Sequence, residues 1–202
     1  MTDHVPDTQR IRRRRAVRVV PEPVRAGRFA AIDFETADYG RDSACALAVV
    51  TGSEQGIERR FVTLIRPPRP HFIFTYIHGI TWAHVHDKPV FRELLPRILR
   101  ELDGVDFIAA HNASFDRGVL YACCEAAGAI SPAHRFLCTV KAARRVWGMR
   151  PAGLADVCRN LAIPLNHHEA ESDALACARI VIEAMKRGIP HEAFLDQRRG
   201  GR

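Results

Sequence analysis

Long apolar stretches are missing from this sequence. The longest uninterrupted apolar run covers residues 44–50, far short of the roughly 20 residues that a membrane-spanning helix needs. The charged N-terminus has no apolar segment ahead of a small-residue cleavage site, so no signal peptide is predicted. The chain has 202 residues, 47% of them hydrophobic and 26% charged, which indicates one globular domain with extensions. We therefore expect a cytoplasmic protein without a membrane partner.

Paired cysteine motifs are missing as well. The chain has six cysteines but no CxxC pair, which argues against a zinc ribbon and against a disulfide framework. The cysteines lie mostly inside apolar runs, at positions 45, 123, 124, 138, 158 and 177. Small buried thiols in a reducing compartment are the simplest interpretation.

Excess positive charge is absent from the middle of the chain and concentrated at its ends. Residues 1–28 carry eight arginines against three acidic residues, and residues 186–202 carry five basic residues against two acidic ones. The middle is nearly neutral, so the ends supply the net charge of +7. We expect a basic, disordered arm at 1–27, a folded domain at 28–187 and a short basic tail at 188–202. Such an arm suits a polyanion such as nucleic acid, although a solubilising tail would have the same composition.

The pattern of apolar residues predicts an α/β layer architecture. Strands are expected at 28–34, 44–51, 57–65, 105–110 and 136–140. Helices are expected at 91–102, 114–127, 154–161 and 170–186. Three strands in a meander, followed by alternating helices and strands, indicate helices packed on a sheet.

Four carboxylates stand where a stability argument does not expect them. Asp33 and Glu35 close the first predicted strand one residue apart, and alternate residues of a strand share a face. Asp116 falls in the first turn of the helix after the fourth strand, and Asp173 lies in the last long helix. Buried carboxylates repel each other and cost desolvation, which a divalent cation removes because hard cations take oxygen ligands. The structural alternatives are a solvated strand end, a favourable helix N-terminus for Asp116 and an exposed helix position for Asp173.

Two adjacent histidines precede the last of these acids. His168 lies five residues before Asp173, at or just before the helix start, where an imidazole can accept a proton from an attacking water. His167 is its competitor, and only spacing separates the two. An ordinary surface histidine is the alternative in a chain with ten of them. A zinc site is disfavoured because it would lack a nearby cysteine and a set ligand spacing. Its ligands would be His78, His84 and His86.

Three segments match, in order, the motifs of a known family. They are Asp33-Phe-Glu35-Thr36, His111-Asn112-Ala-Ser-Phe115-Asp116 and His168-Glu-Ala170-Glu-Ser-Asp173. With these motifs the chain resembles the DnaQ-like 3′→5′ exonucleases, in the DEDDh branch, which is named for four acids and a histidine. The proofreading epsilon subunit of bacterial DNA polymerase III belongs to this family. Residues 77–81 also resemble a family loop between the third strand and the next helix, and the resemblance covers residues 28–186.

The resemblance implies a ribonuclease H-like fold, a mixed five-stranded sheet flanked by helices. It also implies two Mg²⁺ or Mn²⁺ ions, with His168 as the general base because the HxAxxD spacing selects it over His167. The implied metal ligands are Asp33, Glu35, Asp116 and Asp173. Other motif positions lie near the terminal nucleotide in relatives, and here they are Phe34, Thr36, His78, Asn112 and Phe115. The two phenylalanines are equally consistent with core aromatics.

The activity that the resemblance implies is hydrolysis from the 3′ end of DNA, with release of nucleoside 5′-monophosphates, as in proofreading or repair. Two alternatives stay open: an exoribonuclease with the same catalytic set, and a catalytically silent module that binds nucleic acid. The expected partner is the 3′ end of single-stranded or frayed DNA, or of RNA. Because the last residues show no clamp-binding peptide and no polymerase-binding tail, a polymerase or clamp partner is not expected.

Overall fold

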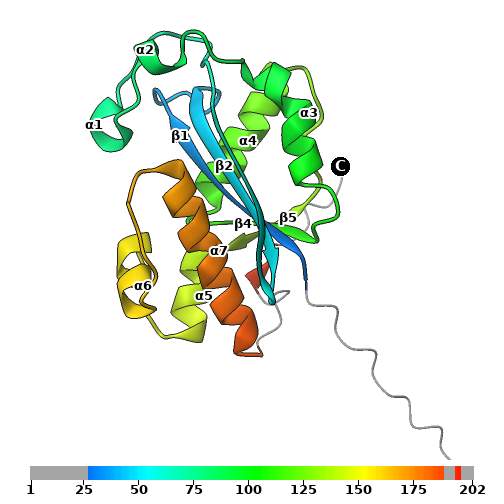
Figure 1. The fold of residues 1–202 in the computed structure, drawn as a ribbon, viewed down its shortest axis with the longest axis vertical. Coiled ribbons are helices and arrows are strands. Elements are labelled where there is room, and N and C mark those ends of the chain that lie inside the picture. The colour runs from blue at the N-terminus through cyan, green and yellow to red at the C-terminus, as the bar shows by residue number, and fades with distance from the viewer. Residues whose placement is uncertain (1–26, 189–193, 197–202) are drawn as a thin grey trace, which may run out of the picture.

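A mixed five-stranded sheet forms the centre of the protein (Figure 1). The computed structural model describes residues 27–188 and 194–196, so the predicted basic arm and tail lie almost wholly outside the described residues. The strands are β1 (Phe29–Thr36), β2 (Ala44–Ser53), β3 (Gly56–Leu64), β4 (Phe107–Ala110) and β5 (Arg135–Cys138). Their order is β3-β2-β1-β4-β5, with β2 antiparallel to β1 and β3, and β4 parallel to β1 and β5. The predicted sheet is confirmed, and β1 is its central strand.

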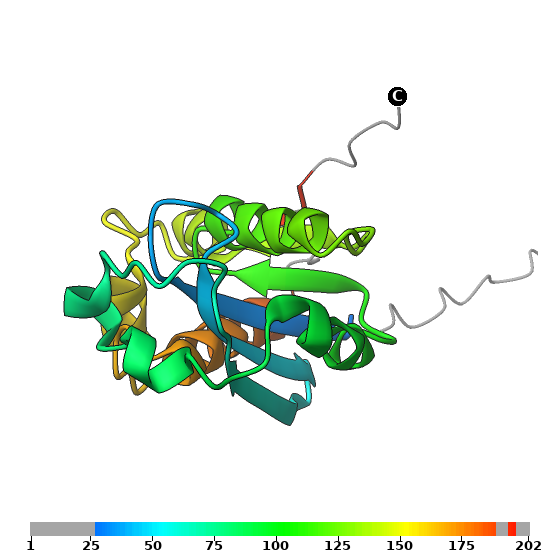
Figure 2. The same cartoon turned by 90° about the horizontal axis from the view of Figure 1, so that it is seen from above.

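Helices cover both faces of this sheet (Figures 1 and 2). They are α1 (Thr75–His78), α2 (Trp82–Val85), α3 (Phe91–Glu101), α4 (Ser114–Ala126), α5 (Thr139–Val146), α6 (Leu154–Asn160) and α7 (Ala170–Lys186). Helices α3 and α4 pack on one face, and α7 packs on the other with α5 and α6 beside it. The short α1 and α2 lie beyond the end of the sheet at which β1 ends (Figure 1). In the described part of the chain, no helix has the length and apolar character needed to cross a membrane.

The central strand alternates between the two cores. Ala30, Ile32 and Phe34 pack in the core under α3 and α4, whereas Phe29 and Ala31 pack in the core under α7. Because side chains along a strand alternate between faces, Asp33 and Glu35 continue the series that faces α7. This agrees with the shared face expected from the sequence.

Small side chains bring α7 close to the sheet. On α7, Ala170, Ala174 and Ala178 recur every four residues and therefore share one face of the helix. They belong to the same buried cluster as Ala46 and Ala48 of the neighbouring strand β2. These small side chains let the first turn of α7 approach the end of β1.

The end of β5 departs from the sequence prediction. A strand was expected over 136–140, but β5 ends at Cys138 and the unpredicted helix α5 begins at Thr139. The pairing of Cys138 with Ala110 is the last of the β4–β5 ladder, because β4 also ends there. Further differences are smaller: β4 begins two residues later than expected, and the short helices α1 and α2 are not predicted from the sequence.

The cysteines behave as the sequence predicts. All six are free thiols, and five are buried while Cys138 is half-buried. Burial raises the pKa of Cys45 and of Cys123 to about 12. Since the thiolate is the reactive form, these thiols are packing groups.

Candidate active site

Two carboxylates lie at the end of the central strand. Asp33 and Glu35 are half-buried and share the face of β1 that α7 covers. Burial, and then the charges of Asp116, Glu35 and Asp173, raise the pKa of Asp33 well above its usual range. Burial also raises the pKa of Glu35 to about 8, with further contributions from Asp173 and Asp116. Without a bound cation, this end of the strand therefore favours protonated carboxyl groups.

Two more carboxylates come from the first turns of α4 and α7. Asp116 is only 2% exposed, and its Oδ1 accepts a hydrogen bond from the Phe34 backbone N–H at 3.1 Å. Burial raises its pKa to about 7 although this hydrogen bond acts in the opposite direction. Asp173 is 5% exposed, and burial raises its pKa while a hydrogen bond from His167 lowers it. Packing has thus removed both groups from water.

The four acids form one electrostatic cluster with the properties of a cation site. The charges of Asp116 and Asp173 act on both Asp33 and Glu35, so residues from β1, α4 and α7 converge. Within the described residues, Oδ1 of Asp173 is buried and has no hydrogen-bond partner. A buried carboxylate oxygen that lacks a donor needs a partner, and a divalent cation prefers oxygen ligands. The acids therefore have the chemistry of a divalent-metal site, and among the described residues the ligand atoms that lie within 4.8 Å of one another are those of Asp173, His167 and His168.

The two adjacent histidines lie beside Asp173. Potential ligand atoms of His167, His168 and Asp173 all fall within 4.8 Å of one another. His167 Nδ1 lies 2.8 Å from Oδ2 of Asp173, and the His168 backbone N–H donates to the same oxygen at 3.2 Å. The imidazole of His168 is exposed and its backbone has a φ of +70°. The structure thus distinguishes the two histidines, because His167 bonds Asp173 through its ring and His168 bonds it through its backbone.

His78 ties helix α1 to the end of β1. Its Nδ1 accepts a hydrogen bond from the Ile80 backbone N–H at 3.0 Å, so Nε2 carries the proton and donates to the carbonyl oxygen of Thr36 at 3.1 Å. Burial lowers the pKa of His78, and the nearby charge of His168 lowers it further. Both Thr36 and His78 therefore lie at the edge of the acidic cluster.

The remaining predicted substrate contacts divide into two groups. Asn112 and Phe115 are exposed at the start of α4, next to Asp116, where Asn112 accepts a hydrogen bond from the Ser114 hydroxyl at 3.1 Å. Phe34 is 3% exposed and packs in the core under α3 and α4, on the face opposite the acids. Its side chain is therefore a core aromatic, and only its backbone N–H reaches the site, through Asp116.

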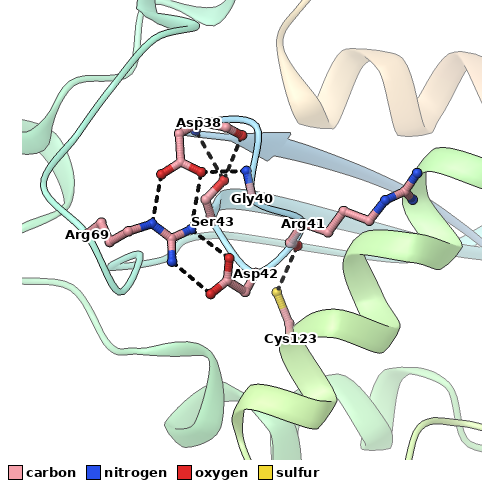
Figure 3. A network of polar contacts seen from close by, with 7 residues as sticks. All are labelled: Asp38, Gly40, Arg41, Asp42, Ser43, Arg69 and Cys123. Atoms are coloured by element: carbon pink, nitrogen blue, oxygen red, sulfur yellow. Dashed lines mark hydrogen bonds and ion pairs between the residues drawn. The ribbon is translucent and has the colours of Figure 1, made fainter.

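One arginine bonds two acidic residues of the loop that follows β1 (Figure 3). The Arg69 guanidinium bonds both Asp38, at 2.9 and 3.2 Å, and Asp42, at 2.6 and 2.9 Å. These contacts lower the pKa of both carboxyl groups. Gly40 between them has no side chain, and a Cβ there would collide with Arg69. Paired ionic hydrogen bonds of this kind fix geometry, so the segment that follows Glu35 is rigidly placed.

One histidine near the site has a role that its motif position does not predict. His111 follows β4, and its Nδ1 lies 2.8 Å from Oγ1 of Thr139, which donates to the Ala110 carbonyl at 3.4 Å. Burial lowers the pKa of His111 to about 4, so the ring is neutral and links β4 to α5. Its place directly before Asn112 in the second motif was the only available signal.

A zinc site on the other histidines has no structural support. In His84, Nδ1 accepts a hydrogen bond from the Thr81 backbone N–H, and in His86 it lies 3.1 Å from the Ala83 carbonyl oxygen. Among the described residues, the group whose potential ligand atoms lie within 4.8 Å of one another consists of His167, His168 and Asp173. It does not include His78, His84 or His86.

The fold and the acidic cluster define a class of nuclease. Residues 30–181 match the model of the Exonuclease family, and the chain belongs to that family. The expected membership in the DnaQ-like exonucleases is thereby confirmed.

Individual relatives agree with this membership. Exodeoxyribonuclease 10 of Escherichia coli (strain K12) is 36% identical over 129 residues, which are 60% of this chain and 53% of that enzyme. The chain therefore spans about half the length of this curated relative. Exonuclease X, solved in complex with 5′ overhanging duplex DNA, is 28% identical with a TM-score of 0.67, over 83% of this chain and 96% of that one. The nuclease domain of 3′hExo, solved with bound rAMP, has a TM-score of 0.72 at 17% identity, over 87% of this chain and 98% of that one, and supports the fold alone.

Proposed function

We propose that this protein hydrolyses DNA from the 3′ end and releases nucleoside 5′-monophosphates, using two Mg²⁺ or Mn²⁺ ions. The observation that carries the proposal is the convergence of four carboxylates from β1, α4 and α7, of which Asp116 and Asp173 are almost fully buried. Repulsion between buried carboxylates does not stabilise a fold. Carboxylates that converge in this way are the ligands that a metal-dependent phosphodiesterase needs.

The acids of the cluster bind the metal ions, and the neighbouring histidine transfers a proton. Asp33, Glu35, Asp116 and Asp173 hold the ions. When bound, the ions supply Lewis acidity and neutralise charge on the phosphate oxygens during in-line displacement. His168, exposed beside Asp173, accepts the proton of the attacking water. The water oxygen forms a bond to phosphorus, the bond between phosphorus and the 3′-oxygen breaks, and that oxygen takes up a proton and stays on the shortened strand as its new 3′-hydroxyl.

The rim of the cluster provides the contacts to the terminal nucleotide. Phe115 is 39% exposed at the start of α4, which allows its ring to stack on a base. Asn112 is exposed beside it. His78 is half-buried and bonds the backbone oxygen of Thr36, which is itself 6% exposed. The basic arm at 1–27 and the basic tail at 188–202 add sequence-independent attraction to phosphates.

The choice of DNA over RNA rests on the more similar relatives. Exodeoxyribonuclease 10 shares 36% of its matched residues with this chain, and the structure of Exonuclease X contains duplex DNA. The RNA-related structures are less similar in sequence, at 17% identity. A role in proofreading or repair and a cytoplasmic location belong to the same proposal.

A gel time course on matched substrates tests the proposal. Single-stranded DNA and RNA of one sequence, both labelled at the 5′ end, are incubated with Mg²⁺, Mn²⁺ or EDTA. We expect a ladder that shortens from the 3′ end of DNA, requires the cation and is lost in Asp116→Asn. The matched control is Asp103→Asn, because Asp103 is exposed and lies in the turn that follows α3.

Three results would redirect or refute the proposal. Faster shortening of RNA would identify an exoribonuclease. Equal activity in EDTA, or full activity of Asp116→Asn, would remove the acidic cluster from the reaction. Binding of both strands without cleavage would identify a silent nucleic-acid-binding module.

A further inference from the structure

His167 contacts both Asp173 and the neighbouring histidine. Its Nδ1 lies 2.8 Å from Oδ2 of Asp173, where it donates a hydrogen bond. Its ring stacks on that of His168, with centroids 3.8 Å apart and planes 17° from parallel. One side chain therefore touches the carboxylate that we assign to metal binding and the imidazole that we assign to proton transfer.

The hydrogen bonds to Asp173 are divided unequally between its two oxygens. Oδ2 accepts from His167 Nδ1 and from the backbone N–H of His168. Oδ1 is buried and has no hydrogen-bond partner among the described residues. The two donors thus fix the rotation of the carboxylate and leave one oxygen for a cation. Hydrogen bonds to a ligating carboxylate commonly act in this way.

The stack restricts the imidazole of His168. His168 is exposed and sits in the left-handed region, at a φ of +70°, which a residue with a Cβ adopts at a cost. Its backbone N–H bonds Asp173, but an exposed side chain keeps its rotamer freedom. The parallel ring of His167 limits the orientations that the His168 ring can take.

The turn around the two histidines is built without the His167 side chain. The Asn166 backbone N–H donates to the Ser172 hydroxyl at 2.7 Å, and the Asn166 amide donates to Glu169 at 2.8 Å. The His167 side chain is 41% exposed, so its removal leaves no cavity in the core. Substitutions at this position can therefore be made in a folded protein.

We propose that His167 is a positioning residue that orients Asp173 for the metal through its Nδ1–H and orients His168 for proton transfer through its ring. This inference rests on the proposed exonuclease function. The HxAxxD spacing assigns a role to His168 and none to His167, and the inference supplies the role of His167.

Two substitutions separate the two contacts. His167→Asn keeps an N–H close to the position of Nδ1 and removes the ring, whereas His167→Phe keeps a ring and removes the donor. His167→Ala removes both contacts. His71→Asn is the matched control, because His71 is exposed in the segment before α1.

The measurements are kcat and KM on 5′-labelled single-stranded DNA, the half-saturating Mn²⁺ concentration, and the Kd of Mn²⁺ alone by calorimetry. For His167→Phe we expect metal affinity to fall about 10–100-fold, with kcat close to wild type at saturating Mn²⁺. For His167→Asn we expect unchanged metal affinity and a kcat lower by about tenfold, because a reacting group loses its orientation. His167→Ala should show both losses. KM for DNA should stay constant throughout.

Several outcomes would overturn the proposal. Variants that match wild type in both kcat and Mn²⁺ affinity would remove His167 from the site. A rise in KM for DNA alone would make it a substrate contact. Activity losses that follow a lower Tm in all three variants would make its role structural. If wild type cleaves neither DNA nor RNA, the exonuclease proposal fails, while the Kd of Mn²⁺ alone still tests the contact with Asp173.

Discussion

Replacing Asp116 by asparagine should stabilise the metal-free protein at alkaline pH. Asp116 is 2% exposed and its pKa is raised from 3.8 to about 7. A pKa that is higher in the folded state than in the unfolded state weakens folding as pH rises. The penalty is absent below the unfolded pKa near 3.8, grows as pH rises, and is complete above pH 7. It then amounts to about 4 kcal/mol, since one pKa unit corresponds to about 1.36 kcal/mol.

The asparagine variant recovers part of this energy. Its side-chain oxygen can still accept the Phe34 backbone N–H, which donates at 3.1 Å in the wild type. Its amide N–H₂ replaces a carboxylate oxygen, and the cost is about 1–3 kcal/mol when that N–H₂ finds no acceptor among the neighbouring carboxyl groups. The net gain is therefore about 2 kcal/mol at pH 8, a rise in Tm of about 4–8 °C for a domain of this size. At pH 4.5 most of the penalty is absent, and the variant should be less stable than wild type.

Thermal unfolding in EDTA, followed by circular dichroism at pH 8 and pH 4.5, measures both values. The exposed control Asp103→Asn should change stability little at either pH, within about 0.5 kcal/mol. Addition of Mn²⁺ should stabilise the wild type more than Asp116→Asn, because binding to the folded state raises its stability. A variant that melts below wild type at pH 8, or an equal difference at both pH values, would refute the repulsion argument.

Three further predictions concern the cation, the base and the arm. Mn²⁺ affinity should rise between pH 6 and 8 with release of protons, because Asp116 and Glu35 have pKa values of about 7 and 8 without metal; calorimetry in two buffers that finds no proton release at pH 6.5 would contradict this. His168→Ala should slow cleavage about 10²–10⁴-fold and leave Mn²⁺ binding intact, and a normal rate would remove His168 from the mechanism. Deletion of residues 1–24 should weaken DNA binding and reduce the dependence of DNA affinity on salt concentration. An unchanged salt dependence would show that the arm does not contact DNA.

Local patterns were sufficient to predict much of the site. Alternation along a strand places Asp33 and Glu35 on one face whatever packs against them. The order of strand and helix signals places Asp116 in a first turn, and the structure has it as the third residue of α4. Helix α5 escaped prediction because the end of β5 depends on where its partner β4 stops, at Ala110. That dependence is a property of the pairing and is not visible within residues 136–146.

The roles of individual side chains also depended on packing. Phe34 and Phe115 are equivalent as motif residues, yet one is 3% exposed and the other 39%. The difference arises because β1 turns Phe34 toward the core under α3 and α4, while Phe115 lies on the outer side of a first turn. Burial is a sum over neighbours that are distant in sequence, so no local pattern contains it.

Residue identity and spacing along single strands and helices were enough to identify the family, the four acids and the two candidate bases. How strongly those groups interact depends on packing between elements that are distant in the sequence. Small side chains let α7 approach β1 and β2, and this approach buries Asp173 beside Asp33 and Glu35 and raises their pKa values. It also separated His167 from His168, because only folding shows which ring reaches the Asp173 carboxylate.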